Sequence, residues 1–220
     1  MLKNLAFIIK TSQDFIRTNE DNPPECDKLK LNSFFEAVSD SYIPMLQMFE
    51  RLKNDGISFK IGLVLPPVLC SMLDDEKIRQ LYVDFLDKRI ALGKKEINRY
   101  KDDSLACELA TSITEKNKEL KRTFCEVYQK NLTAQFAKYQ KEGYLEILGT
   151  CATDIFMPYY DDIPEALSAQ IEMGLQSYKN AVESFRKAFT YLNSAILLEL
   201  KKLYAHTVMP IQFYTAAAFF

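Results

Sequence analysis

The chain has 220 residues, of which 48% are hydrophobic and 26% charged, and its formal net charge is -2. This is ordinary globular composition, with enough length for one sizeable core. The nearly balanced charge, without a basic stripe along the chain, excludes nucleic-acid binding from the expected functions.

Hydropathy and cysteine usage exclude further classes. The apolar run near the N-terminus covers only Leu5–Ile9, which is too short for a signal peptide. No stretch reaches about 18 uninterrupted apolar residues, so we expect no membrane span. The cysteines are odd in number and form no C-x-x-C pair, so we expect reduced, buried thiols in a cytoplasmic protein, without disulfides, metal or other cofactor. The five are Cys26, Cys70, Cys107, Cys125 and Cys151.

The first third of the chain alternates between strand and helix signals. Leu5–Ile9 is a continuous apolar run that suits a strand covered on both faces. Thr18–Lys30 holds two prolines amid charges and predicts a loop. Asn32 or Ser33 can cap a helix, and Glu36 then falls in its first turn, where a carboxylate complements exposed N–H groups.

A second helix and a strand follow. Ser41 precedes apolar residues at helical spacing, among them Phe49, for which core packing is the expected role. Asn54–Gly56 should end that helix. Ser58–Leu65 predicts the second strand, which Pro66 and Pro67 terminate.

The remainder is largely helical. Glu76–Tyr100 predicts one long amphipathic helix, and Leu105–Glu142 predicts a helical stretch broken once and ended by Gly143. The charges within residues 114–122 alternate in sign and indicate a solvated helix face. Tyr144–Ala152 predicts the third strand, and Pro164 opens a helix that runs to about Phe185. Strands separated by helical crossovers predict an α/β fold with a parallel sheet.

Several segments, in order, resemble glycoside hydrolase family 57, and within it the α-1,4-glucan branching-enzyme type. The resemblance covers roughly residues 4–189. It implies the N-terminal portion of an incomplete (β/α)7 barrel with long helical segments, a retaining mechanism and an α-glucan substrate such as glycogen or amylose. The similar segments are residues 5–17, 34–73, 82–99, 139–158 and 165–189.

The chain departs from the family pattern at the positions that the resemblance makes catalytic. The family's His-x-His pair after the first strand corresponds here to Lys10 and Ser12, and its histidine after the third strand corresponds to Asp154. His206, the only histidine, lies outside the similar region. The nucleophile segment of the family is approximated only by AILLEL, in which Glu199 is a candidate one residue out of register.

These departures shape the chemistry that we expect. Retaining glycoside cleavage needs two carboxyl groups about 5–5.5 Å apart, and Glu199 alone cannot supply both. Residues that follow strand ends gather at the mouth of a β/α barrel, so Lys10, Ser12 and Asp154 are expected substrate-binding positions. Lys10 and Asp154 either form an ion pair there or are solvated loop residues. Tyr159 and Tyr160 follow the third strand and are candidate sugar platforms.

We therefore divide the chain into a family-like barrel portion, residues 1–189, and a divergent tail, residues 190–220. The favoured function is a family 57-like protein of α-glucan metabolism that is truncated or frame-shifted, or catalytically inactive on its own. The alternative is a non-catalytic module that binds α-glucan or a partner on the same scaffold. An exposed sheet edge predicts self-association or a second chain that completes the barrel.

Overall fold

The computed structural model describes residues 7–17, 27–153, 155, 160 and 162–181, and the chain divides into two compact units. The sheet unit comprises Met1–Phe15, Ser58–Ser71 and Phe136–Phe220. The helical unit comprises Ile16–Ile57 and Met72–Gln135. The units interleave along the sequence, and each is described by itself.

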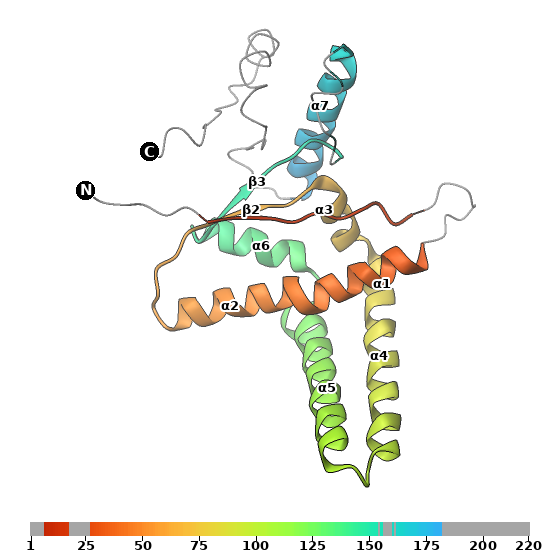
Figure 1. Ribbon diagram of the computed structural model, residues 1–220. Coiled ribbons are helices and arrows are strands. Elements are labelled where there is room, and N and C mark those ends of the chain that lie inside the picture. Colours follow the sequence, from red (N-terminus) through yellow and green to blue (C-terminus); the bar gives the residue numbers. More distant parts are fainter. Residues whose placement is uncertain (1–6, 18–26, 154, 156–159, 161, 182–220) are drawn as a thin grey trace. The chain divides into compact units, whose positions relative to one another are not determined.

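The sheet unit is built on three parallel strands, β1 (Ile8–Lys10), β2 (Ile61–Val64) and β3 (Leu145–Leu148), with β2 in the middle (Figure 1). The predicted parallel sheet is confirmed, although each described strand is shorter than its apolar run. The register aligns the last residues of the strands, because Lys10 pairs with Val64 and Val64 pairs with Leu148. All three strands therefore end at one edge, called here the carboxyl edge.

Gly62 explains how the three strands approach one another at the centre of the sheet. A Cβ added there would lie 3.3 Å from the side chains of both Ile8 and Leu148. On β2 the following residues, Leu63 and Val64, are buried. The central strand therefore has buried apolar side chains at Leu63 and Val64. It has no side chain at Gly62, where the side chains of the two neighbouring strands come close.

Helices α6 (Leu132–Lys141) and α7 (Pro164–Ala181) flank β3 in sequence. Gly143 lies between α6 and β3 with φ at +87°, a conformation that glycine adopts without strain, so its predicted role as a terminator is confirmed. Pro164 opens α7 as predicted. The predicted end of this helix near Phe185 lies outside the described residues.

The helical unit begins with α1 (Lys28–Ala37), which continues through a π-helical turn, η1 (Val38–Tyr42), into α2 (Ile43–Asn54) (Figure 1). The prediction of a loop as far as Lys30 is wrong at its end, and so is the prediction of a cap at Asn32 or Ser33. Asp27 caps the helix instead, since its carboxylate accepts hydrogen bonds from the N–H groups of Leu29 and Lys30.

Two consequences follow from this earlier start. Glu36 lies at the end of α1, so its predicted place in a first helical turn is wrong. Ser41 does not open a separate helix, because the chain stays helical across η1, which ends at Tyr42. Phe49 on α2 is fully buried, and its predicted role in the core is confirmed.

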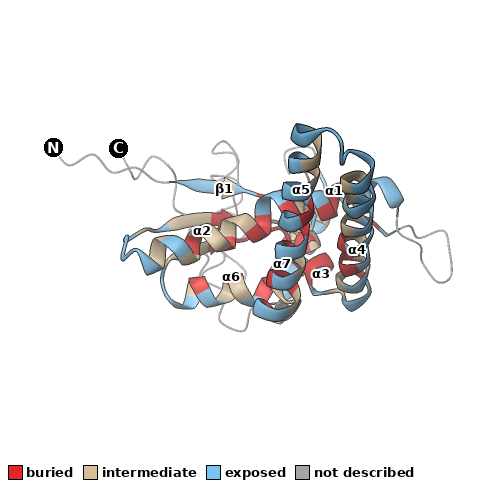
Figure 2. Cartoon of the chain, turned by 90° about the horizontal axis from the view of Figure 1, so that it is seen from below, coloured by how far each residue is buried: buried red, intermediate tan, exposed pale blue. Residues whose placement is uncertain are grey.

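Of the other helices, α4 (Glu76–Arg99), α5 (Ser104–Arg122) and α6 match the sequence pattern closely. Helix α3 (Pro67–Asp74) follows β2, and α4 is the predicted long helix. Helix α5 leads into a second π-helical turn, η2 (Thr123–Val127), and the predicted break falls between η2 and α6. Asp75 and Asp103 cap α4 and α5. Helices α4 and α5 form an antiparallel hairpin (Figure 1), whose outer turns carry no buried residue (Figure 2).

The cysteines and the charged helix face can also be compared with their predictions. Cys70 and Cys151 are buried as expected, whereas Cys107 and Cys125 are only half-buried, and none of these four described cysteines forms a disulfide. Cys26 lies outside the described residues. The expected solvated face on α5 is confirmed by exposed ion pairs, which join Lys116 to Asp40, Lys118 to Glu115, Lys121 to Asp87 and Arg122 to Glu119.

Candidate functional site at the carboxyl edge of the sheet

The first segment of the candidate site is Lys10–Ser12, at the end of β1. Lys10 is the last residue of the strand, and both Lys10 and Ser12 are exposed. Side chains two residues apart in extended chain lie on the same face. The two positions that the resemblance pairs with family histidines thus lie together at the carboxyl edge.

Thr11, between them, fixes this segment. Its backbone N–H and its Oγ1 both donate hydrogen bonds to the carbonyl oxygen of Val64, at 3.2 and 2.7 Å. The side chain is buried, so its hydroxyl needs this partner. The two hydrogen bonds tie the end of β1 to the end of β2 and hold the neighbouring Lys10 and Ser12 in place.

The second strand contributes only apolar residues to the edge. Leu65 and the two prolines that follow it are buried, and the N–H of Leu65 donates to the carbonyl oxygen of Leu148 at 3.3 Å. This segment forms an apolar floor between the ends of β1 and β3. The predicted termination of β2 at Pro66 and Pro67 is confirmed.

The segment after β3 is held by a single glutamine of α7. The Oε1 of Gln170 accepts from the backbone N–H of Thr153 at 3.0 Å and lies 3.1 Å from the Thr153 Oγ1. The Gln170 carbonyl oxygen accepts from the N–H of Ala152 at 2.9 Å. Three hydrogen bonds from one residue therefore set the path of the chain just before Asp154.

Gly174 allows this segment to lie directly against α7. A Cβ at Gly174 would come within 2.7 Å of the Thr150 carbonyl oxygen and 3.1 Å of the Ala152 nitrogen. Cys151 lies in the small apolar cluster beneath, with Leu167 and Ile171. Burial raises the pKa of the Cys151 thiol to about 11, so the thiol stays protonated and serves as a packing group.

Of the other predicted site residues, the structure describes only Tyr160. Tyr160 is exposed, and its carbonyl oxygen accepts from the N–H of Ile163 just before α7. Asp154, Tyr159 and Glu199 lie outside the described residues, as does His206. The proposed ion pair between Lys10 and Asp154 therefore stays a prediction.

The described part of the carboxyl edge offers one cation and several hydroxyl groups. Residues 10–13, 65–67 and 149–153 include no carboxylate, so this part of the edge does not hold the acid pair that glycoside cleavage requires. Among the described residues, no cluster of three His, Cys, Asp or Glu side chains could hold a metal ion. None of the described helices is long and apolar enough to span a membrane.

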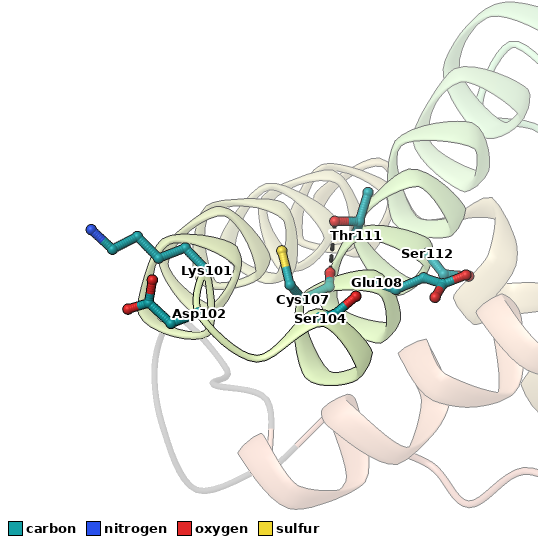
Figure 3. A pocket seen from close by; sticks show the side chains of 7 residues that line it. All are labelled: Lys101, Asp102, Ser104, Cys107, Glu108, Thr111 and Ser112. Carbon is teal, nitrogen blue, oxygen red and sulfur yellow. Dashed lines mark hydrogen bonds between the residues drawn. The ribbon is translucent and has the colours of Figure 1, made fainter.

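A separate hollow lies at the tip of the α4–α5 hairpin in the helical unit (Figure 3). Its volume is about 590 Å³. It includes no aromatic side chain and none of the site residues predicted from the sequence. The lining residues are Lys101, Asp102, Ser104, Cys107, Glu108, Thr111 and Ser112.

Sequence reasoning missed Thr11, Gln170 and Gly174. The alternation of an extended chain could have identified Thr11 as the buried position between the exposed residues Lys10 and Ser12. Nothing local singles out Gln170 or Gly174, because their partners, Thr150–Thr153, lie about twenty residues earlier in the chain.

Comparison with known proteins gives a consistent result. The model of glycosyl hydrolase family 57 matches residues 6–199. A 1,4-α-glucan branching enzyme of Thermococcus kodakarensis, TK1436, is 27% identical over 175 residues, which cover 80% of this chain and 24% of that enzyme. The chain thus spans about a quarter of the length of this curated relative.

Solved structures extend the likeness to the fold. The α-amylase AmyC from Thermotoga maritima superposes with a TM-score of 0.78 at 26% identity, covering 91% of this chain and 38% of that one. A GH57-type branching enzyme from Pyrococcus horikoshii gives a TM-score of 0.72 at 25% identity, covering 84% and 34%. This chain thus spans less than two fifths of the length of either solved chain.

Proposed function

Because the chain belongs to glycosyl hydrolase family 57, we propose that it is a protein of α-glucan metabolism, of the branching-enzyme type, that is catalytically inactive on its own. The observation that carries this proposal is the family match over residues 6–199. Lysine and serine at the two positions that the resemblance pairs with the family's His-x-His support it. The scaffold of the family is kept, and residues that its chemistry uses are replaced.

The chemistry of the edge supports inactivity. A retaining glycosidase needs a nucleophile and an acid on opposite sides of the scissile bond, about 5–5.5 Å apart. Glu199, the last residue of the family match, is the single candidate nucleophile. Loss of one member of a catalytic unit removes most of the rate advantage of the whole unit.

The same edge supports glucan binding without cleavage, which is the second candidate function. Lys10, Ser12 and Thr150 offer donors and acceptors to sugar hydroxyls beside the apolar floor of Leu65 and Pro66. Tyr160, and Tyr159 beside it in sequence, add aromatic surface for stacking. The Lys10–Asp154 ion pair is part of this proposal, because it would replace two histidines with a charged, hydrogen-bonding pair.

Two further expectations belong with this proposal. The carboxyl edge forms part of a (β/α)7 barrel whose other strands come from elsewhere in the chain or from a second polypeptide. The lack of disulfides among the described cysteines favours a reducing compartment such as the cytoplasm.

The test is an assay of the purified chain on amylose. We expect no branching, followed as loss of iodine colour, and slowed migration in an electrophoresis gel that contains amylose. Lys10→Ala should reduce the retardation several-fold. Lys60→Ala is the matched control. Lys60 is also exposed, but it precedes β2 and so lies at the amino ends of the strands, near Glu146. Branching activity would refute inactivity, and migration unaffected by amylose would refute glucan binding.

A further inference from the structure

The inference concerns the hydroxyl group of Thr153, in the segment that follows β3. Thr153 is exposed, yet its backbone N–H and its Oγ1 both bond to a single atom, the Oε1 of Gln170 on α7. The hydroxyl of an exposed serine or threonine ordinarily rotates to suit whichever partner is near. Here a helix of the same unit holds the hydroxyl in one direction.

The direction of this hydrogen bond follows from the atoms that make it. A backbone N–H can only donate, so the Gln170 atom that lies 3.0 Å from the Thr153 nitrogen is the carbonyl oxygen of the amide. The same oxygen lies 3.1 Å from the Thr153 Oγ1, and it has no hydrogen to give. The Thr153 hydroxyl therefore donates its one hydrogen to Gln170. Toward a ligand it can act only as an acceptor, through its lone pairs.

The backbone on both sides of Thr153 is also held. The N–H of Ala152 donates to the carbonyl oxygen of Gln170 at 2.9 Å, and the N–H of Ile155 donates to that of Thr153 at 2.9 Å. Gly174, one turn after Gln170 on α7, leaves room for the chain to lie against the helix. Because the chain and the hydroxyl are fixed before a ligand arrives, binding costs little conformational entropy at this position.

Thr153 belongs to the edge of the sheet at which glucan binding is proposed above. The segments that follow parallel strands gather at the carboxyl edge, and ligands of such sheets bind there. The edge thus carries a donor in the Lys10 ammonium and an acceptor in Thr153. A glucan presents many hydroxyl groups that both donate and accept. It can therefore accept a hydrogen bond from Lys10 and donate one to Thr153.

The fixed direction of the hydroxyl also disfavours one class of ligand. A lysine at a strand end could attract an anion, but the oxygens of an ionised phosphate or carboxylate group are acceptors only. They would face the lone pairs of Thr153 without a hydrogen between them. The arrangement therefore favours a neutral polyhydroxyl ligand over an anion.

We propose that Thr153 is a sugar-binding residue of the carboxyl edge, where it accepts a hydrogen bond from a glucan hydroxyl, and that Gln170 is its positioning residue. This proposal rests on the glucan binding proposed above. Gln170 acts through Thr153, by taking the hydrogen of its hydroxyl and by fixing where its oxygen lies.

The test is electrophoresis of the full chain in gels of increasing amylose content, which gives a dissociation constant for each variant. Thr153→Val keeps the shape of the side chain but loses the hydroxyl, so the dissociation constant should rise about two- to tenfold. Thr153→Ser keeps the hydroxyl and should bind amylose as the parent chain does. Thr111→Val is the matched control, because Thr111 is exposed on α5 and also donates through its Oγ1 to a carbonyl oxygen, that of Cys107.

Variants of Gln170 test the positioning role, with folding checked by circular dichroism. Gln170→Leu removes the acceptor and should weaken amylose binding, whereas Gln170→Glu keeps an acceptor oxygen and should retain most of the affinity. Because Gln170 acts through Thr153, adding Gln170→Leu to Thr153→Val should weaken binding no further. Equal losses in Gln170→Leu and Gln170→Glu, or a fully additive double variant, would overturn the positioning role.

The outcomes separate this proposal from the one on which it rests. A parent chain that amylose does not retard would overturn both. A parent chain that amylose retards, with Thr153→Val retarded equally, would overturn the role of Thr153 and leave glucan binding in place.

Discussion

The Tyr82 hydroxyl lies 2.9 Å from the Ser39 Oγ, and this hydrogen bond joins α4 to the π-helical turn η1. The Ser39 Oγ also donates to the carbonyl oxygen of Phe35 at 2.8 Å, so the tyrosine is the donor to serine. On its other side, the Tyr82 ring packs edge-on against Phe124 of η2, with centroids 4.8 Å apart. One buried tyrosine thus links both irregular turns of the helical unit.

The first prediction compares the two ends of this hydrogen bond. Tyr82→Phe removes the donor but leaves Ser39 bonded to Phe35, so it should cost roughly 1 kcal/mol of unfolding free energy. Ser39→Ala leaves the Tyr82 hydroxyl buried without this partner and should cost more, about 1–3 kcal/mol. Urea titrations measure both. The reverse order of costs would show that the hydroxyl finds another partner.

The second prediction concerns alkaline pH. Burial raises the pKa values of Tyr42, Tyr82 and Tyr128 to about 12. The ordinary pKa of tyrosine is 10.0, so between pH 10 and about pH 12 these tyrosines lose their protons in the unfolded chain but keep them in the folded chain. The free energy of unfolding therefore falls as the pH rises through this range. Urea midpoints measured from neutral pH upward should decline there, and Tyr82→Phe should reduce the steepness. An unchanged slope in that variant would exclude Tyr82 as a contributor.

The third prediction concerns Gly174. In an exposed helix, replacing glycine by alanine gains up to about 1 kcal/mol of stability. Here the added methyl group meets the backbone of Thr150 and Ala152, so we expect Gly174→Ala to destabilise by about 1–3 kcal/mol. Ser168→Ala, at an exposed position of α7, is the control and should be nearly neutral. A more stable Gly174→Ala variant would mean that the β3 segment does not lie against α7.

The fourth prediction concerns the contact between Gly93 and Thr114. Gly93→Ala should destabilise the protein, because the new methyl group overlaps the Thr114 hydroxyl. Thr114→Ala removes that oxygen, so the double variant should be more stable than the sum of the single changes, with a coupling of roughly 0.5–3 kcal/mol. Strictly additive changes in thermal unfolding would contradict the close contact between α4 and α5 at these two residues.

Sequence periodicity predicted the parts of the fold that local signals determine. Apolar runs located all three strands, and their helical crossovers predicted a parallel sheet. The long period-3.6 pattern gave α4 almost to the residue. The first helix was predicted to start too late, because Asp27 is one of several polar residues that could cap it. A new helix was wrongly predicted after Ser41, because the π-helical turn η1 continues the first helix past this residue. A π-helical turn leaves no sequence signal that distinguishes it from a helix boundary.

The candidate site was predictable only in part. Lys10 and Ser12 could be placed at a strand end, because the resemblance and the apolar run agree on where β1 stops. The contacts that shape the edge could not, since Thr11 acts through Val64 and Gln170 acts through Thr153. The first contact depends on the register of β1 against β2, and the second depends on how α7 packs against the segment after β3. Neither is encoded in a local sequence pattern.

The most direct test of the central claim is hydrogen–deuterium exchange of the chain with and without maltoheptaose. Glucan bound at the carboxyl edge should slow exchange in peptides covering residues 7–17 and 149–153. Peptides covering residues 101–112, around the hollow at the hairpin tip, should be unchanged and serve as the internal control. Unaltered exchange at the carboxyl edge, or slowing confined to the hairpin tip, would contradict the account.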